Sequence, residues 1–115
     1  MKQEGGGLKR RWFEDDGMDL VVWHDEAGAV DGFQILYGHG DSEHALTWRA
    51  AGGFTHNRVD QGDRLLGKLA PILVPDGVVP WARITTEFAA RSAKLEPALR
   101  ELVQTKLKES KIRGP

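Results

Sequence analysis

Four side chains able to bind an anion or exchange a proton fall in the stretch 44–58: His44, Arg49, His56 and Arg58. A guanidinium group offers paired donors to a carboxylate or phosphate, and an imidazole changes charge near neutral pH. The two aromatic residues between them, Trp48 and Phe54, suit the wall of such a site. The stretch therefore predicts a ligand-binding cluster for a small anion made of these four residues.

Which of these side chains share a face depends on the turn between the two strands expected here. A three-residue turn "AAG" would place Trp48 opposite Phe54 and His44 opposite Arg58. A two-residue turn "AG" would instead place Arg49 opposite Phe54. Side chains alternate along a strand, so a one-residue shift moves the whole set to the other face. The sequence leaves both registers open.

Metal and cofactor chemistry has little support in the residue spacing. His24, His39, His44 and His56 are 15, 5 and 12 positions apart, which matches no metal-binding signature. The absence of cysteine excludes thiolate metal sites and disulfides. We therefore expect no metal and no cofactor.

The remaining polar segments have the composition of turns and helix ends. "HGDSEH" (39–44) offers groups for acid–base chemistry, and "EDDGMD" (14–19) offers carboxylates, but each is interpreted as a turn. The basic end "KLKESKIRGP" (106–115) is interpreted as a charged helix end. No G-x-S-x-G or P-loop pattern is present, so the question of an enzyme stays open, with a non-enzymatic role favoured.

Two kinds of apolar periodicity define the elements that must position these residues. Alternation at period two, with β-branched and aromatic residues, predicts strands over 8–15, 18–25, 30–38, 44–49 and 53–60. Short connectors with glycine or turn-forming residues join them into an antiparallel meander. "PILV" (71–74) is predicted as a sixth strand, the alternative being a short helix around Leu65–Leu69.

After Pro80 the apolar period becomes helical. Trp81, Ile84, Phe88 and Leu95 form one stripe, and Leu99, Leu102, Val103 and Leu107 form another after Pro97, which should end or kink the first helix. The predicted fold class is α+β, with an antiparallel β-meander of five or six strands followed by two C-terminal helices packed on one face. We expect flexible tails at 1–7 and 111–115 and one domain over 8–110.

Size and charge narrow the functional class. The chain has 115 residues, 40% of them hydrophobic and 29% charged, which suits a single folded domain. Residues 1–60 carry a net charge of −5 and residues 61–115 a net charge of +4. No global basic footprint exists, which disfavours nucleic acid as a partner. No apolar run of membrane-spanning length or leader-like segment is visible, so we expect a cytoplasmic protein with no membrane partner.

The segments "RRWFED", "GFQILYG", "ALTWR" and "GFTHNRVD", followed by "PILVPDG" and two terminal helices, resemble a group of small uncharacterised bacterial proteins. The resemblance covers residues 10–110 and implies a bacterial, single-domain, cytoplasmic protein. It brings no catalytic or binding role with it.

The leading functional hypothesis is a small binding or protein-interaction module, with a homodimer or a protein partner among the expected assemblies. Its four tryptophans supply anchors for a core or an interface. The alternative is a small-ligand-binding protein or enzyme that uses the His/Arg cluster.

Overall fold

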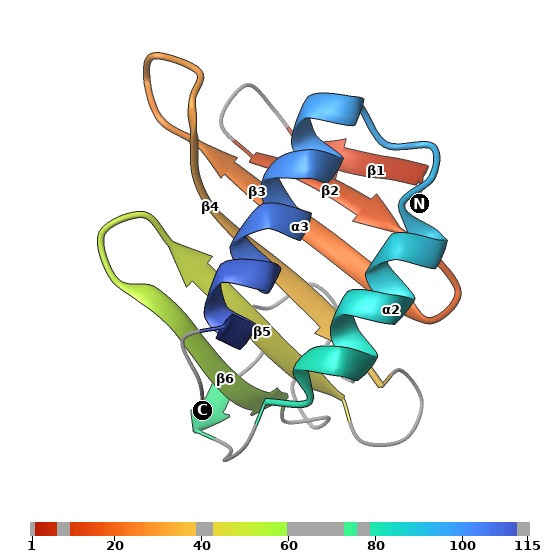
Figure 1. Cartoon of the computed structure of the whole chain (residues 1–115). Helices are drawn as coiled ribbons and strands as arrows, with labels where there is room; N and C mark the ends of the chain where they lie inside the picture. Colours follow the sequence, from red (N-terminus) through yellow and green to blue (C-terminus); the bar gives the residue numbers. More distant parts are fainter. Residues whose placement is uncertain (1, 7–9, 39–42, 60–72, 76–78, 113–115) are drawn as a thin grey trace.

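The computed structural model describes residues 2–6, 10–38, 43–59, 73–75 and 79–112 (Figure 1). Seven strands form one sheet in chain order, and every neighbouring pair is antiparallel. The strands are β1 (Lys2–Gly6), β2 (Arg10–Glu14), β3 (Met18–His24), β4 (Val30–Tyr37), β5 (His44–Arg49), β6 (Gly53–Val59) and β7 (Leu73–Pro75). Two helices follow, α2 (Trp81–Arg91) and α3 (Pro97–Ile112). The predicted α+β meander with two C-terminal helices is therefore confirmed.

The first strand differs from the expectation of a flexible tail. Lys2–Gly6 pair with β2 through a register that shifts between Gln3 and Gly5. Hydrogen-bonding groups along the outer edge of β2 would otherwise have no strand partner, and an added strand satisfies them in spite of a glycine-rich sequence. The sheet thus has one strand more than the six predicted.

For the region after β6, the sequence allows either a strand or a short helix. Leu73–Pro75 form the short strand β7, which overlaps the predicted "PILV" strand and pairs with the end of β6. The alternative helix around Leu65–Leu69 lies outside the described residues. At the other end, α3 continues to Ile112, two residues beyond the expected domain boundary at 110.

Two of the described hairpin turns, β3–β4 and β5–β6, contain a glycine in the left-handed region. Gly28 has φ +90° in the β3–β4 turn, where its N–H donates to the Asp25 carbonyl oxygen. Gly53 has φ +76° at the start of β6. A side chain would strain the backbone in either position, so glycine fixes both turns.

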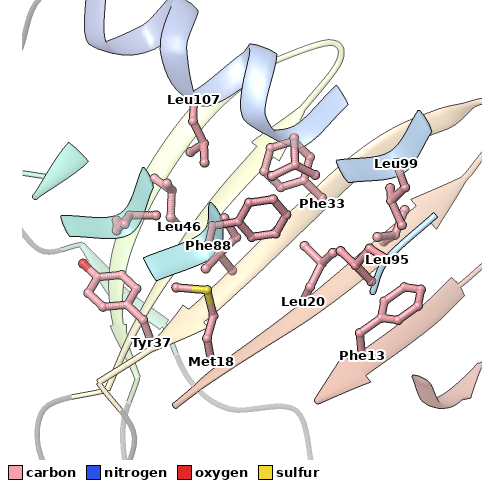
Figure 2. Close-up of a cluster of buried hydrophobic side chains, with 14 residues drawn as sticks. Phe13, Met18, Leu20, Phe33, Tyr37, Leu46, Phe88, Leu95, Leu99 and Leu107 are labelled. Atoms are coloured by element: carbon pink, nitrogen blue, oxygen red, sulfur yellow. The ribbon is translucent and has the colours of Figure 1, made fainter. Parts of the chain in front are cut away.

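The two helices lie on the same face of the sheet, and the main core fills the space between the layers (Figures 1 and 2). Strand residues of this core alternate with period two, and the helical residues recur every three or four positions. Its buried members are Phe13, Met18, Leu20, Val22, Phe33, Ile35, Tyr37, Leu46, Ile84, Phe88, Leu95, Leu99, Val103 and Leu107. This arrangement confirms the predicted packing of the helices on one sheet face.

Helix α3 begins at Pro97, whose missing N–H and fixed φ suit the first helical turn. Arg100 then fastens the two helices together. Its Nε donates to Ser92 Oγ at 3.1 Å and its Nη2 donates to the Ala89 carbonyl oxygen at 3.3 Å. Ser92 is fully buried, so this bond satisfies a hydroxyl that has lost water.

Two ion pairs attach the helical layer to the β2 side of the sheet. Arg11 Nη1 donates to both carboxylate oxygens of Glu96 at 2.9 Å. Arg91 pairs with Asp15 in the β2–β3 turn. A Cβ at Gly17 would lie 2.7 Å from Arg91 Nη2, so glycine there leaves room for the guanidinium.

Gly32 in β4 should not tolerate a side chain. A Cβ there would lie 2.7 Å from the Trp48 carbonyl oxygen and 3.0 Å from Arg49 Cδ, and the backbone oxygen cannot move away without distorting the sheet. We expect Gly32→Ala to lower the free energy of unfolding by about 1–3 kcal/mol, measured by urea denaturation. Gly52→Ala is the matched control, because the nearest atom to its Cβ is 4.0 Å away. Equal midpoints for the two variants would contradict the prediction.

The Asp15–Arg91 pair should make stability depend on pH in acid. Burial acts to raise the pKa of Asp15, but the Gly17 N–H and the Arg91 guanidinium outweigh it, so the pKa lies below its usual 3.8. The pair therefore stabilises the fold above pH 3.8, and this contribution is lost as pH falls through the lower folded pKa.

We expect Asp15→Asn to reduce the free energy of unfolding near neutral pH by on the order of 0.5–1 kcal/mol. The difference from the wild type should disappear in strong acid, when thermal melts are compared across pH. Asp16→Asn, an exposed neighbour, makes the same charge change and should show no such convergence. A constant Asp15→Asn deficit at all pH values would refute the assignment.

Candidate functional site

The β5–β6 hairpin adopts the three-residue turn. Arg49 pairs with Gly53, and Ala50, Ala51 and Gly52 form the loop between them. The Gly52 N–H donates to the Arg49 carbonyl oxygen at 3.1 Å, and Gly53 follows in the left-handed region. This combination of a tight turn and a left-handed glycine is a common three-residue hairpin loop. The structure thus selects one of the two registers that the sequence left open.

This register places His44, His56 and Arg58 on the same face as Trp48, under the helices. His44 pairs with Arg58, and His56 pairs with Leu46, which is fully buried. Arg49 lies on the opposite face, where its guanidinium carbon sits 4.3 Å from the centre of the Trp23 ring. The structure therefore brings together three of the four predicted residues and separates Arg49 from them.

Cross-strand rows explain why a polar cluster borders the core. One row runs Phe13, Leu20, Ile35, Leu46 and His56 from β2 to β6. The next row runs Met18, Tyr37, His44 and Arg58 from β3 to β6. Both rows are apolar on the early strands and polar on the later ones, so the cluster marks the corner where the core ends.

Three aromatic rings stack at this corner. The rings of His44 and His56 are 5.2 Å apart and nearly parallel, at 8°. Tyr37 stacks on His44 at 5.6 Å and on His56 at 5.9 Å. The Tyr37 hydroxyl also hydrogen-bonds His56 Nε2. Tyr37 is only 2% exposed and lies at the edge of the core cluster in Figure 2, so His56 satisfies a hydroxyl that is removed from water.

Helix α2 supplies the other wall of the corner. The guanidinium carbon of Arg83 lies 5.4 Å from the centre of the Tyr37 ring, and Trp81 meets Phe54 edge to face at 5.2 Å. Arg83 also lies 3.7 Å from the Glu87 carboxylate, a weak, solvent-screened contact. We define the corner cluster as Tyr37, His44, His56, Arg58 and Arg83.

Of the other two histidines, only His24 lies within the described residues, and its hydrogen bonds are made elsewhere in the sheet. His24 accepts a hydrogen bond from Arg11 Nε on its Nε2, so its Nδ1–H donates to the Gly28 carbonyl oxygen. His39, together with Asp41 and Ser42 of the "HGDSEH" segment, lies outside the described residues. Within the described part of the chain, no group of three or more His, Cys, Asp or Glu side chains is arranged to hold a metal ion.

Residues of the other two polar segments make contacts within the fold. "EDDGMD" forms the β2–β3 turn as predicted, with Asp15 accepting from the Gly17 N–H at 3.2 Å. In the C-terminal helix, Lys106 lies 5.2 Å from the Trp48 ring centre and 3.7 Å from the Glu109 carboxylate. Among the described helices, none is long and apolar enough to cross a membrane.

Comparisons of the chain with protein-family models, with curated proteins and with solved structures found no match.

Sequence reasoning missed two members of the corner cluster. Tyr37 lies on the apolar face of its strand with Phe33 and Ile35, but its hydroxyl has a polar partner, His56, two strands away. The register of both hairpins was needed to find it. Arg83 comes from a helix distant in sequence, and no local pattern indicates that it meets Tyr37.

Removing the Tyr37 hydroxyl should have a specific effect on His56. We expect Tyr37→Phe to lower the free energy of unfolding by about 1 kcal/mol and to shift the ring ¹⁵N resonances of His56, because Nε2 loses its partner. Thr47→Val is a matched control, since it removes the Gln34–Thr47 side-chain bond of 3.0 Å on the other face. Both variants should lose similar stability, and unchanged His56 resonances in Tyr37→Phe would refute the bond.

Proposed function

We propose that the protein is a binding module whose corner cluster takes a small anionic ligand. The observation that carries this proposal is the convergence of two imidazoles and two arginines on one corner of the sheet. His44 and His56 stack at 5.2 Å, Arg58 is the cross-strand partner of His44, and Arg83 lies over Tyr37.

The charge of the corner favours an anion. Arg58 and Arg83 are permanently cationic, and both are exposed enough to reach a ligand. The acid that faces Arg83 is Glu87, at 3.7 Å. The ring N–H groups of the imidazoles are further donors for an oxyanion beside the two guanidinium groups.

Binding is favoured over catalysis by the position of the tyrosine. A Tyr–His hydrogen bond is suited to proton transfer, but a general acid must reach its substrate directly or through one water molecule. Tyr37 is 2% exposed, and its hydroxyl is held by His56. The half-exposed imidazoles and the two arginines are the groups that a solute can meet.

Inorganic phosphate is a suitable probe for this site. We expect the ring resonances of His44 and His56 to shift saturably during a phosphate titration followed by NMR. Arg58→Gln should weaken binding by about fivefold or more, the loss typical of one charge-assisted hydrogen bond. Arg58 is exposed, so this variant should keep the wild-type fold.

Lys94→Gln is the matched control. It removes one positive charge from an exposed position in the α2–α3 connection, and phosphate binding should be unchanged. Shifts that do not saturate, or an equal loss in both variants, would show only general charge attraction and would refute the site.

A further inference from the structure

The sheet face opposite the helices carries a second group of aromatic and basic side chains. Two neighbouring cross-strand rows form it. One runs Arg10, Trp23, Gly32 and Arg49 from β2 to β5, and the other runs Trp12, Val21, Gln34, Thr47 and Thr55 from β2 to β6. Both described helices lie on the other face (Figure 1), so neither of them covers these rows.

Gly32 allows an arginine and a tryptophan two strands apart to stack. Trp23 and Arg49 flank Gly32 in the same row, and the guanidinium carbon lies 4.3 Å from the indole centre. A Cβ at Gly32 would lie 3.0 Å from Arg49 Cδ and 3.6 Å from Trp23 Cε3. The missing side chain therefore makes the space that this stack occupies.

A second pair adjoins the first. Arg10 is the direct cross-strand partner of Trp23, and its guanidinium carbon lies 5.7 Å from the Trp12 ring centre. Trp12 is oriented by its Nε1–H, which donates to Asp19 Oδ2 at 3.1 Å. Arginine and tryptophan side chains therefore alternate in the order Arg49, Trp23, Arg10 and Trp12. We call these four residues, which come from both cross-strand rows, the Arg–Trp row.

The charges of the Arg–Trp row are not neutralised by the described residues. Arg10 and Arg49 are exposed, and among the described side chains neither forms an ion pair or a hydrogen bond. The two cross-strand rows contain no carboxylate. Stacking on an indole uses the flat face of a guanidinium and leaves its N–H donors at the edge, where they can bind an oxyanion in pairs.

We propose that the Arg–Trp row binds single-stranded nucleic acid. Such a chain alternates planar bases with phosphates, and the row alternates half-exposed indoles with unneutralised guanidinium groups. An acidic peptide would pair with the arginines but leave the indoles without partners. An apolar partner would bury two charges without counterions, which is strongly unfavourable.

This proposal is contrary to the sequence-based expectation, which disfavoured nucleic acid because the overall charge is −1 and no global basic footprint exists. The basic residues of this face are few, but folding places Arg10 of β2 and Arg49 of β5 in one cross-strand row with Trp23 between them. With two phosphate contacts, the slope of log affinity against log salt should be about −1.4, which is shallow for a nucleic-acid-binding protein.

The test uses the full chain and a fluorescein-labelled oligothymidylate of about twelve nucleotides, a length that covers a single binding surface. We expect a saturable rise in anisotropy at about 50 mM salt, together with quenching of tryptophan fluorescence by base stacking. Absence of saturable binding under these conditions overturns the proposal.

Variants locate the binding surface. The double variant Arg10→Gln/Arg49→Gln should lose about tenfold in affinity and nearly all of the salt dependence. Trp23→Leu should lose about fivefold or more, and its circular dichroism and urea midpoint establish whether it is folded. If Trp23→Leu is unfolded, the arginine double variant alone decides whether this face binds the oligonucleotide. Both arginines are exposed, so that variant should remain folded.

The matched control is Lys94→Gln/Lys108→Gln, which removes two charges from exposed positions outside the sheet. It should bind like the wild type. An equal loss in this control would place binding on general positive charge or on the C-terminal helix, and would overturn the proposal. A competition experiment compares oligoglutamate with the unlabelled oligonucleotide. If oligoglutamate competes equally well, the ligand is an acidic protein surface, and the nucleic-acid proposal is overturned.

Discussion

The register of the β5–β6 hairpin is the constraint on which both faces of the sheet depend. A left-handed glycine, Gly53, follows a tight turn and sets Arg49 opposite it. Shifting the register by one residue would carry His56 out of the corner and bring a different set of side chains under the helices. Arg49 would stay beside Trp23, because the β3–β4 and β4–β5 registers place both of them next to Gly32. One glycine conformation thus determines which side chains of β6 lie under the helices and which lie on the opposite face.

The same register resolves a difficulty in the core. Tyr37 extends the apolar alternation of β4, and its ring packs with the core, but a buried hydroxyl without a partner is destabilising. His56 supplies that partner from two strands away while its other surfaces remain half exposed. The polar corner is therefore a structural boundary of the core, at the place where we propose an anion site. This boundary explains why polar side chains lie next to fully buried Leu46.

The elements of this fold could be predicted because each has a clear period. Alternation identified the strands β2 to β6, and the helical stripe broken at Pro97 identified both helices. The strand β1 could not be predicted, because its pairing satisfies the edge of β2 rather than any preference of a glycine-rich segment. At the site, His44, His56 and Arg58 could be grouped from one hairpin once a register was assumed. Arg49, Tyr37 and Arg83 could not be placed correctly, since their positions depend on contacts with other strands and with a helix.

The two sides of the helical layer are attached by different forces. Near β2 the contacts are ionic, between Arg11 and Glu96 and between Arg91 and Asp15. Near β6 they are aromatic, between Trp81 and Phe54 and between Arg83 and Tyr37. Salt screens partly exposed ion pairs but has little effect on packed rings. Rising ionic strength should therefore weaken the attachment near β2 more than the attachment near β6, while the buried core between the two layers keeps the helices in place.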